Sequence, residues 1–253
     1  MSISAESVKQ LRERTGAGMM ECKRALVETQ GDLDAAAELM RKQGLAKADK
    51  KAARIAAEGV IVLARAADGK SAAMVEINCE TDFVAREADF ASFAEAVAEQ
   101  ALAARADSLE KLAAAKLTRG ETVEERRRAL VAKIGENITL RRVGVQTSNG
   151  HLGAYLHGKR IGALVALEGG NETLAHDLAM HSAASNPRHL SVDDVPPDVM
   201  AKERQIETEK ALGEGKPADI VAKMVEGRLR KSLMQFGGAD PVRTVRGAGY
   251  ALG

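Results

Sequence analysis

Two turn dipeptides set between strand-like runs constrain the fold of this chain most. Asp68-Gly69 lies between the runs 59–66 and 72–79, which are rich in Val, Ile and Ala. Asp-Gly readily adopts the positive backbone angles of a two-residue turn, so the pattern predicts a β-hairpin. Apolar residues with helical spacing follow over 89–104. This region therefore predicts two antiparallel strands and a helix that packs on them.

The same order recurs further along the chain. A helix is predicted over 122–135, and three more strand-like runs follow at 138–147, 151–157 and 161–168. Asn149-Gly150 supplies the turn between the first two of these runs. A helical pattern then begins at Asn171 or Thr173 and stops before Pro187. A hairpin followed by a helix thus occurs twice, which predicts an α+β core with antiparallel strands and an internal structural duplication.

The N-terminal region predicts three short helices separated by glycines. Ser4 and Asp32 are suited to cap the first and third, and Gly16, Gly31 and Gly44 are suited to end the three in turn. Apolar residues recur on one face of each helix, so the three helices are expected to share a small core.

Two other segments connect or extend these units. Residues 46–58 are rich in Ala, Lys and Arg without a clear apolar stripe, which is typical of a solvated linker that is partly helical. Helical patterns at 197–212 and 217–233 are joined by a Gly-rich turn and predict a helical hairpin that packs mainly on itself. The predicted parts are 1–45, a three-helix module; 46–58, a linker; 59–140 and 141–189, two core subdomains; 190–233, the helical hairpin; and 234–253, an atypical tail.

Composition argues against several classes of partner. Lys and Arg number 37 against 36 Asp and Glu, so the net charge of +1 gives no field that attracts phosphate backbones or anionic lipid. Neither nucleic acid nor a membrane is therefore the expected partner. The N-terminus has no basic segment followed by an apolar run, and the longest aliphatic run, 60–63, is too short to cross a bilayer. We expect a cytoplasmic protein.

Catalytic and cofactor motifs are also missing from the sequence. It contains neither a phosphate-binding Gly-x-x-x-x-Gly-Lys-Ser/Thr loop nor a Gly-x-Ser-x-Gly nucleophile turn, and its five histidines lack metal-ligand spacing. Cys22 and Cys79 are too few for a disulfide framework or a zinc site, so we expect both to be small buried apolar residues. No enzymatic activity, cofactor or metal is predicted.

One segment, Asn78-Cys79-Glu80-Thr81-Asp82-Phe83-Val84, places an acid beside one of only four phenylalanines at the end of a strand. Two interpretations are open. In the structural one, Thr81 caps a following helix and Phe83 packs beneath it. In the functional one, Asp82 and Phe83 project and probe a polar site on a partner.

A family resemblance decides between these interpretations. The segment Thr15-Gly16-Ala17-Gly18-Met19-Met20-Glu21-Cys22-Lys23-Arg24-Ala25-Leu26, the 78–85 segment and Val131-Ala132-Lys133-Ile134-Gly135-Glu136-Asn137-Ile138 resemble the elongation factor Ts family. Further matches, at 157–162, 179–181 and 223–228, keep the family's order and spacing. The resemblance covers residues 1 to about 231. It implies a guanine nucleotide exchange factor for the bacterial elongation factor Tu.

The resemblance also implies a fold and a set of contacts. The fold is a ubiquitin-associated-like three-helix module, a core of two related strand-and-helix subdomains and a projecting antiparallel helical pair. Asp82 and Phe83 match the pair that intrudes near the partner's magnesium site. The full set of partner-binding residues that it implies is Thr81, Asp82, Phe83, Val84, Lys9, Arg12, Met19, Met20, Lys23, Ile134, Gly135 and His157. Whether two copies pair, alone or in a complex with two partner molecules, is left open.

Met19 and Met20 admit a structural interpretation too. Adjacent residues on a helix point about 100° apart, so both cannot share one buried stripe. In the structural interpretation one of them packs in the module's core, whereas the resemblance favours the pair as an adaptable contact with the partner. The cations Lys9, Arg12 and Lys23 equally suit a solvated helix face.

The family pattern fails after Arg230. Residues 228–233 and 241–252 instead resemble the recognition helix and wing of winged-helix response regulators, without the helices that would support DNA binding. We expect a poorly packed, chimaeric or frame-altered end and weaker exchange than in a typical family member. The alternative functions are a scaffold that binds its partner without changing nucleotide release and, with less support, DNA binding through the tail.

Overall fold

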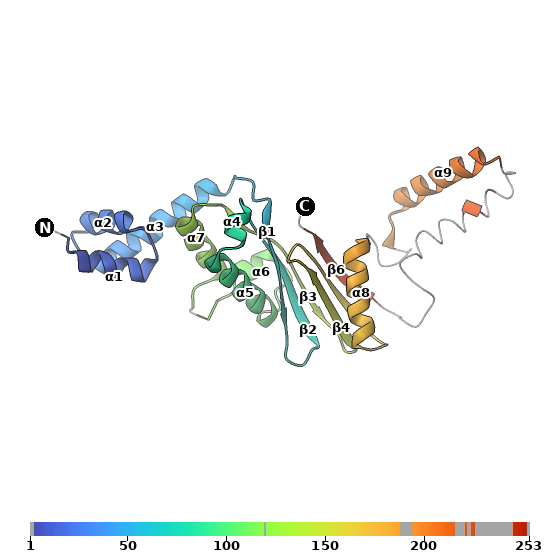
Figure 1. Ribbon diagram of the computed structural model, residues 1–253, viewed down its shortest axis with the longest axis horizontal. Coiled ribbons are helices and arrows are strands. Elements are labelled where there is room, and N and C mark those ends of the chain that lie inside the picture. Colours follow the sequence, from blue (N-terminus) through green and yellow to red (C-terminus); the bar gives the residue numbers. More distant parts are fainter. Residues whose placement is uncertain are drawn as a thin grey trace. The chain divides into compact units, whose positions relative to one another are not determined.

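The computed structural model describes residues 3–118, 120–187, 194–215, 221, 224–225 and 245–251. The fold is α+β, as the sequence predicts (Figure 1). By their internal contacts, the described residues form two compact units. The first comprises 3–147 with 156–162, and the second comprises 148–155 with most of the chain after 162. No helix in the described part of the chain is long and apolar enough to span a bilayer.

Three helices form the N-terminal module: α1 (Ala5–Thr15), α2 (Met19–Glu28) and α3 (Leu33–Lys51). The predicted caps of α1 and α3 are confirmed. The Ser4 hydroxyl accepts the Ser7 N–H at 3.0 Å, and the Asp32 carboxylate accepts two N–H groups at 2.9 Å. The module's core consists of Val8, Leu11, Cys22, Ala25, Leu26 and Ala36. Burying these side chains gives each short helix the stability that its length alone does not provide.

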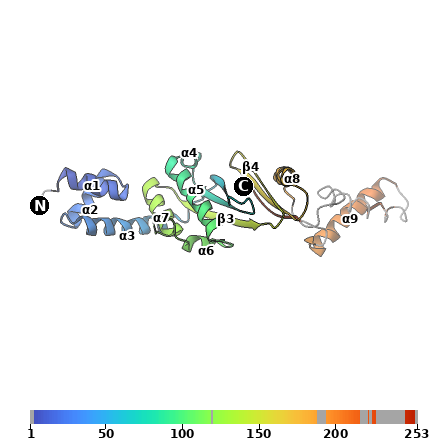
Figure 2. The same cartoon turned by 90° about the horizontal axis from the view of Figure 1, so that it is seen from below.

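Gly44 does not end the third helix, so that prediction is wrong. α3 continues to Lys51, and its second half packs against α7 (Val123–Ile134), as Figure 2 shows. A Cβ placed on Gly44 would lie 3.3 Å from the Ala132 Cβ, which means that glycine is used here for close helix approach. Ala48, within the predicted solvated linker, is buried in the main core.

The first unit contains an antiparallel sheet with the order β1-β2-β3. Its strands are β1 (Glu58–Arg65), β2 (Ser71–Cys79) and β3 (Ile138–Thr147). Central β2 is buried at every position after Ser71, because it has neighbours on both edges. The pairings Glu58↔Cys79 and Cys79↔Ile138 place the start of β1, the end of β2 and the start of β3 at one end of the sheet.

Helices pack on this sheet and form the main core. They are α5 (Ala88–Ala103), α6 (Leu109–Ala114), which the sequence did not predict, and α7; a single turn, α4 (Asp82–Ala85), precedes them. The predicted inward face of α5 is confirmed: Phe90, Phe93 and Val97 are buried against β2 and α7 residues such as Val75 and Val131. The Thr122 hydroxyl and the Glu125 carboxylate form a reciprocal capping box at the start of α7.

The second sheet has the order β4-β5-β6 and is accompanied by α8 (Glu172–Ser185), which Asn171 caps. Its strands are β4 (His151–His157), β5 (Ile161–Leu167) and β6 (Val245–Ala251). Part of the tail that the sequence predicts to be poorly packed thus forms a strand that pairs with β5. The Val and Tyr residues of this segment favour a strand. Residues 234–244 and 252–253 of that tail lie outside the described residues.

The first arm of the predicted helical hairpin is α9 (Pro197–Gly213), with proline in its first turn. Most of the second arm lies outside the described residues. Val221 and Val225 are described there, and both are buried in one cluster with Ala211 of α9. These contacts are those of two arms that pack on each other.

Candidate partner-binding site

The segment after β2 forms a short exposed turn, α4. Thr81 caps it: its hydroxyl accepts the Val84 N–H at 3.4 Å, and Val84 is buried in the main core. Phe83 does not pack beneath the helix, because its side chain is 80% exposed. The structural interpretation of this segment is therefore correct for Thr81 and wrong for Phe83. Within the turn, Val84 and the partly buried Ala85 pack against the core, while Phe83 projects from it.

Asp82 projects beside Phe83 and has one partner of its own. Its Oδ2 accepts a hydrogen bond from Arg86 at 2.7 Å, four residues along the chain. The Arg86 side chain is largely exposed and that of Asp82 is about half exposed, so water and salt weaken this ion pair. The carboxylate is consequently held by a contact that an incoming group can replace at low cost.

Two glutamates connect the turn to the loop after α7. The Glu136 Oε2 accepts the N–H groups of Glu80 at 3.1 Å and Thr81 at 3.0 Å, while its Oε1 accepts the Thr81 hydroxyl at 2.7 Å. In return, the Glu80 Oε1 accepts the Asn137 N–H at 2.6 Å and lies 3.6 Å from Arg54. The 80–84 turn and the 135–137 loop thus hold each other in both directions.

Three predicted contact residues lie around the same end of the first sheet. Ile134 is half-buried against the main core, and Gly135 closes α7 with a φ of +92°. The Lys51 ammonium donates a hydrogen bond to the Gly135 carbonyl. His157 is exposed at the β4–β5 turn, which is attached to β1 by a Lys159 carbonyl that accepts the Ile61 N–H and by an Arg160–Glu58 ion pair of 3.2 Å.

The remaining predicted contacts lie on α1 and α2. Lys9, Arg12 and Lys23 are exposed. Met19 and Met20 are 59% and 69% exposed, so the structural interpretation that places one of them in the core is wrong. Leu11, Cys22 and Leu26 fill that core instead. The structure thus divides the predicted site residues between two surfaces, one on the core subdomain and one on the module. Their roles stay predictions.

The buried Cys79 thiol stabilises the base of the turn and is not a reactive group. Burial, followed by the nearby Glu136 charge, raises the pKa of its thiol to about 12, although a hydrogen bond with Thr81 acts the other way. The protonated thiol donates to the Thr81 carbonyl at 3.2 Å. Cys22 is also buried and free, as predicted. Among the described residues, no cluster of His, Cys, Asp and Glu is arranged to hold a metal ion.

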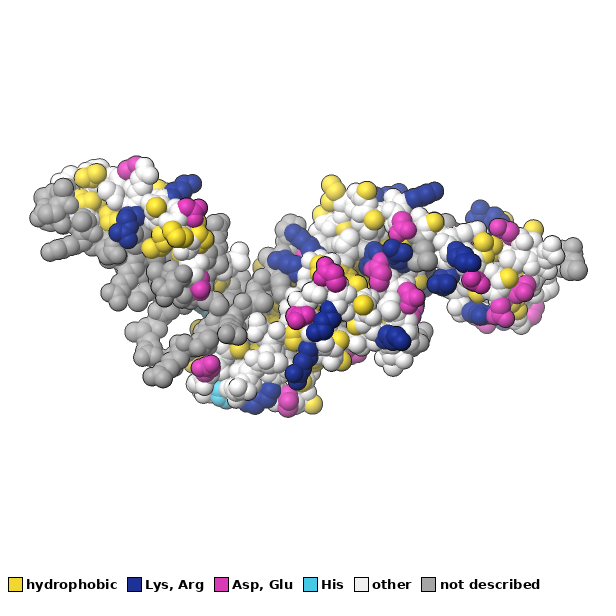
Figure 3. Space-filling model, turned by 180° about the vertical axis from the view of Figure 1, so that it is seen from behind, with side chains coloured by type: hydrophobic (Ala, Val, Ile, Leu, Met, Phe, Trp, Pro, Cys, Tyr) yellow, Lys and Arg dark blue, Asp and Glu magenta, His cyan; other side chains and the backbone are white. Residues whose placement is uncertain are grey.

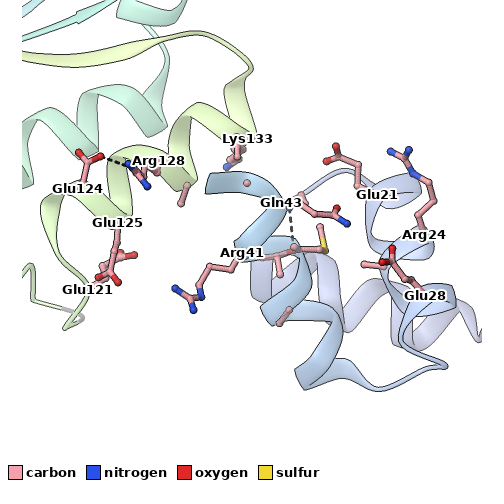
Figure 4. Close-up of a pocket in the computed structure, with 18 residues that line it drawn as sticks. Glu21, Arg24, Glu28, Arg41, Gln43, Glu121, Glu124, Glu125, Arg128 and Lys133 are labelled. Atoms are coloured by element: carbon pink, nitrogen blue, oxygen red, sulfur yellow. Dashed lines mark hydrogen bonds and ion pairs between the residues drawn. The ribbon is translucent and has the colours of Figure 1, made fainter. Parts of the chain in front are cut away.

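A cavity of about 700 Å³ lies between α2, α3 and α7, and its lining includes none of the predicted contact residues (Figure 4). Charges of both signs line it, among them Glu21, Arg24, Arg41 and Lys133, with Glu124 and Arg128 paired at 2.7 Å. Figure 3 likewise shows cations and anions intermixed over the face that it displays. This distribution matches the near-neutral net charge and does not form a single-sign surface.

Some residues of this site were missed from the sequence. Ile55 is 85% exposed in a segment whose backbone is fixed by Asn78 and Asn137, whose side-chain amides donate to the Ala56 and Arg54 carbonyls. Its position beside Arg54 brings it to the Glu80 end of the turn. Glu136 was present in a recognised motif, but nothing local indicated what its carboxylate would contact.

Comparisons with known proteins identify the family of the chain. A family profile described as Elongation factor TS matches residues 80–237. The chain is 59% identical over 234 residues to elongation factor Ts of Alkalilimnicola ehrlichii, covering 92% of this chain and 80% of that protein. It is 57% identical to that of Methylococcus capsulatus over the same shares, and 55% identical to that of Halorhodospira halophila over 93% and 81%. The chain therefore belongs to the elongation factor Ts family of translation elongation factors.

Proposed function

We propose that this protein is a guanine nucleotide exchange factor that binds elongation factor Tu and accelerates GDP release. The observation that supports this most is the exposed Phe83 beside the Asp82 carboxylate on a turn with a fixed base. Aromatic residues are enriched at the centres of protein interfaces, so an exposed phenylalanine on a fixed turn is suited to insertion into a partner. In this proposal the protein is not an enzyme, carries no cofactor and acts in the cytoplasm.

The proposed mechanism is displacement within the partner. A GTP-binding protein holds GDP through backbone amides, a lysine and an octahedral Mg²⁺ site that demands near-ideal geometry. Phe83 would insert beside that site and shift a supporting side chain or water. Asp82 would exchange Arg86 for donors near the metal, or repel phosphate, which an apolar group cannot do.

The remaining contacts would supply affinity. Met19 and Met20 provide adaptable apolar area, and Lys9, Arg12 and Lys23 provide positive charge around them. Ile134, Gly135 and His157 would extend the contact around Thr81 and Val84. Coupling between nucleotide and factor is reciprocal, typically about 5- to 150-fold, so either nucleotide would also displace the factor.

Release of a fluorescent GDP from elongation factor Tu tests this proposal. Stopped-flow rates would be measured over a range of factor concentrations, with excess unlabelled GDP, for wild type, Asp82→Asn and Phe83→Ala. We expect wild type to accelerate release, and each variant to lower the rate at saturation by about 10-fold or more, as hot-spot truncations do.

Leu212→Ala is the matched control, since it also truncates an exposed apolar side chain, on α9. It is expected to leave release unchanged. Binding of wild type without faster release would instead support a scaffold. No binding at all would contradict both functions.

A further inference from the structure

The Asp82–Phe83 turn is too short to hold its own shape. α4 contains four residues, so it forms about one turn, and an isolated turn of helix is unstable in water. Phe83 adds nothing to its stability, because most of its side chain is in solvent. Contacts from elsewhere must therefore fix the backbone that carries Asp82 and Phe83.

Glu136 supplies most of those contacts. Its carboxylate accepts three hydrogen bonds from Glu80 and Thr81, which are 55 or 56 residues away in the chain. Two of these donors are backbone N–H groups at the entrance to the turn. Because Thr81 is also the cap of α4, fixing its backbone and hydroxyl fixes the first residue of the turn.

The end of α7 directs Glu136 toward the turn. Gly135 adopts a left-handed conformation, which residues with a side chain rarely adopt, and so reverses the chain just before Glu136. The Lys51 hydrogen bond to the Gly135 carbonyl holds this reversal, and the Asn137 N–H is held by Glu80. The Ile134-Gly135 pair thus has a structural use in addition to any contact with a partner.

We propose that Glu136 is a positioning residue for nucleotide exchange. Through Thr81, it holds the Asp82–Phe83 turn in the conformation that inserts into the partner; this rests on the proposed exchange function. Without Glu136, the turn samples other conformations, and only a fraction of bound complexes carries an inserted Phe83. Loss of Glu136 leaves the module surface on α1 and α2 able to bind the partner. It should therefore lower the GDP release rate at saturation and change the half-saturating factor concentration much less.

The first test compares release rates in a mutant cycle. Glu136→Ala is expected to lower the saturated rate by about 10-fold, the effect of losing a hydrogen bond to a charged group. Glu136→Gln keeps one acceptor oxygen and should lie between this variant and wild type. In a background that carries both Asp82→Asn and Phe83→Ala, Glu136→Ala should cause no further loss, because Glu136 acts through these two side chains.

Glu124→Gln is the matched control. It removes an acid of α7 that pairs with Arg127 and Arg128, and none of the hydrogen bonds or ion pairs of Glu124 among the described residues reaches the turn. It should lower thermal stability and leave the saturated rate unchanged. Equal losses from Glu136→Ala in both backgrounds, or no loss at all, would overturn the positioning role.

Amide hydrogen exchange in the free protein tests the positioning role of Glu136 independently of nucleotide exchange on the partner. In the free protein, Glu136→Ala should speed exchange of the Thr81 and Val84 amides by about 10-fold, whereas Glu124→Gln should not. If Phe83→Ala leaves GDP release unchanged, the proposed function fails while this measurement still decides whether Glu136 fixes the turn. Unchanged protection of both amides in Glu136→Ala would rule that out.

Discussion

The Asp82–Phe83 turn and the Met19–Met20 pair both expose large apolar side chains, but on supports of different rigidity. The turn is anchored by buried Val84 and by three hydrogen bonds to Glu136. The methionines stand in the first turn of α2, whose N-cap is Gly18 and receives no side-chain hydrogen bond. Phenylalanine has a rigid ring, whereas methionine has a flexible side chain that adapts to its surroundings.

This difference separates two tasks within one proposed interface. A side chain that must shift a metal site needs a defined position, because displacement depends on where it lies. A side chain that only adds affinity can adapt to the partner's surface. We therefore expect substitutions in the turn to change the rate at saturation, and substitutions of the methionines to change the concentration that is required.

Removal of both methionines is expected to have the largest effect. Met19→Ala with Met20→Ala should raise the half-saturating factor concentration by about 30-fold, since each truncation of a buried contact costs about 1 kcal/mol. The saturated release rate should stay within about 2-fold of wild type. The measurement is GDP release over a wide range of factor concentration. A fall in the saturated rate would remove the distinction between the two surfaces.

Substitution of the rigid Phe83 side chain by a flexible methionine is expected to have the second largest effect. Phe83→Met retains an exposed apolar group of similar size, but adds rotatable bonds whose freedom is lost on insertion. We expect the saturated rate to fall by about 5- to 10-fold, with a half-saturating concentration near that of wild type. Leu212→Met is the control, as it makes a similar change at an exposed position on α9. Full activity of Phe83→Met would show that the turn needs only apolar area.

Several helices and strands could be predicted from the sequence, because the residue patterns that specify them are local. β3, β4 and the start of α9 match the prediction, and caps such as Ser4 and Asp32 have their signal within three residues. Gly44 could not be assigned in this way. Whether a glycine ends a helix or allows close packing depends on Ala132, which is remote in the chain.

The sequence indicates candidate site residues but not the contacts that support them. The Thr81-Asp82-Phe83-Val84 sequence fits a capped helix with Phe83 either inside or outside, and only the tertiary structure shows that Val84 takes the buried place. Glu136 was missed for a similar reason, because its hydrogen-bond donors lie more than fifty residues away. Neither the exposure of Phe83 nor the function of Glu136 has a local sequence signal.

Helix α7 of the core packs against α3 of the N-terminal module. Substitution of Glu124, in the first turn of α7, tests how much this residue stabilises the protein. Burial opposes ionisation of Glu124, but hydrogen bonds from Arg127 and Arg128 outweigh it and hold its pKa below the usual 4.5. Arg127 also donates to the Ile138 carbonyl at 2.6 Å. Because Glu124 is partly solvated, we expect Glu124→Gln to lower the free energy of unfolding by only about 1 kcal/mol at pH 7.

The sign of the pH dependence follows from the lowered pKa. The stabilisation by Glu124 is complete above the unfolded-state pKa near 4.5 and is lost as pH falls through the lower folded-state value. The difference between wild type and Glu124→Gln should therefore shrink below pH 4.5 in urea unfolding curves. A difference that stays constant into acid would mean that packing, and not charge, is lost in the variant.

The smallest effects are expected from the cations around the methionines. Lys9→Ala and Lys23→Ala should each raise the half-saturating concentration by about 2- to 3-fold at low salt, because exposed charges act mainly on association. At about 0.5 M salt the effect should vanish, since screening then acts within a few ångström. Lys202→Ala on α9 is the control and should have no effect at either salt concentration. An effect of Lys23→Ala that persists in high salt would instead indicate a direct, desolvated contact with the partner. In that case this part of the module surface, like the Asp82–Phe83 turn, would require a defined geometry.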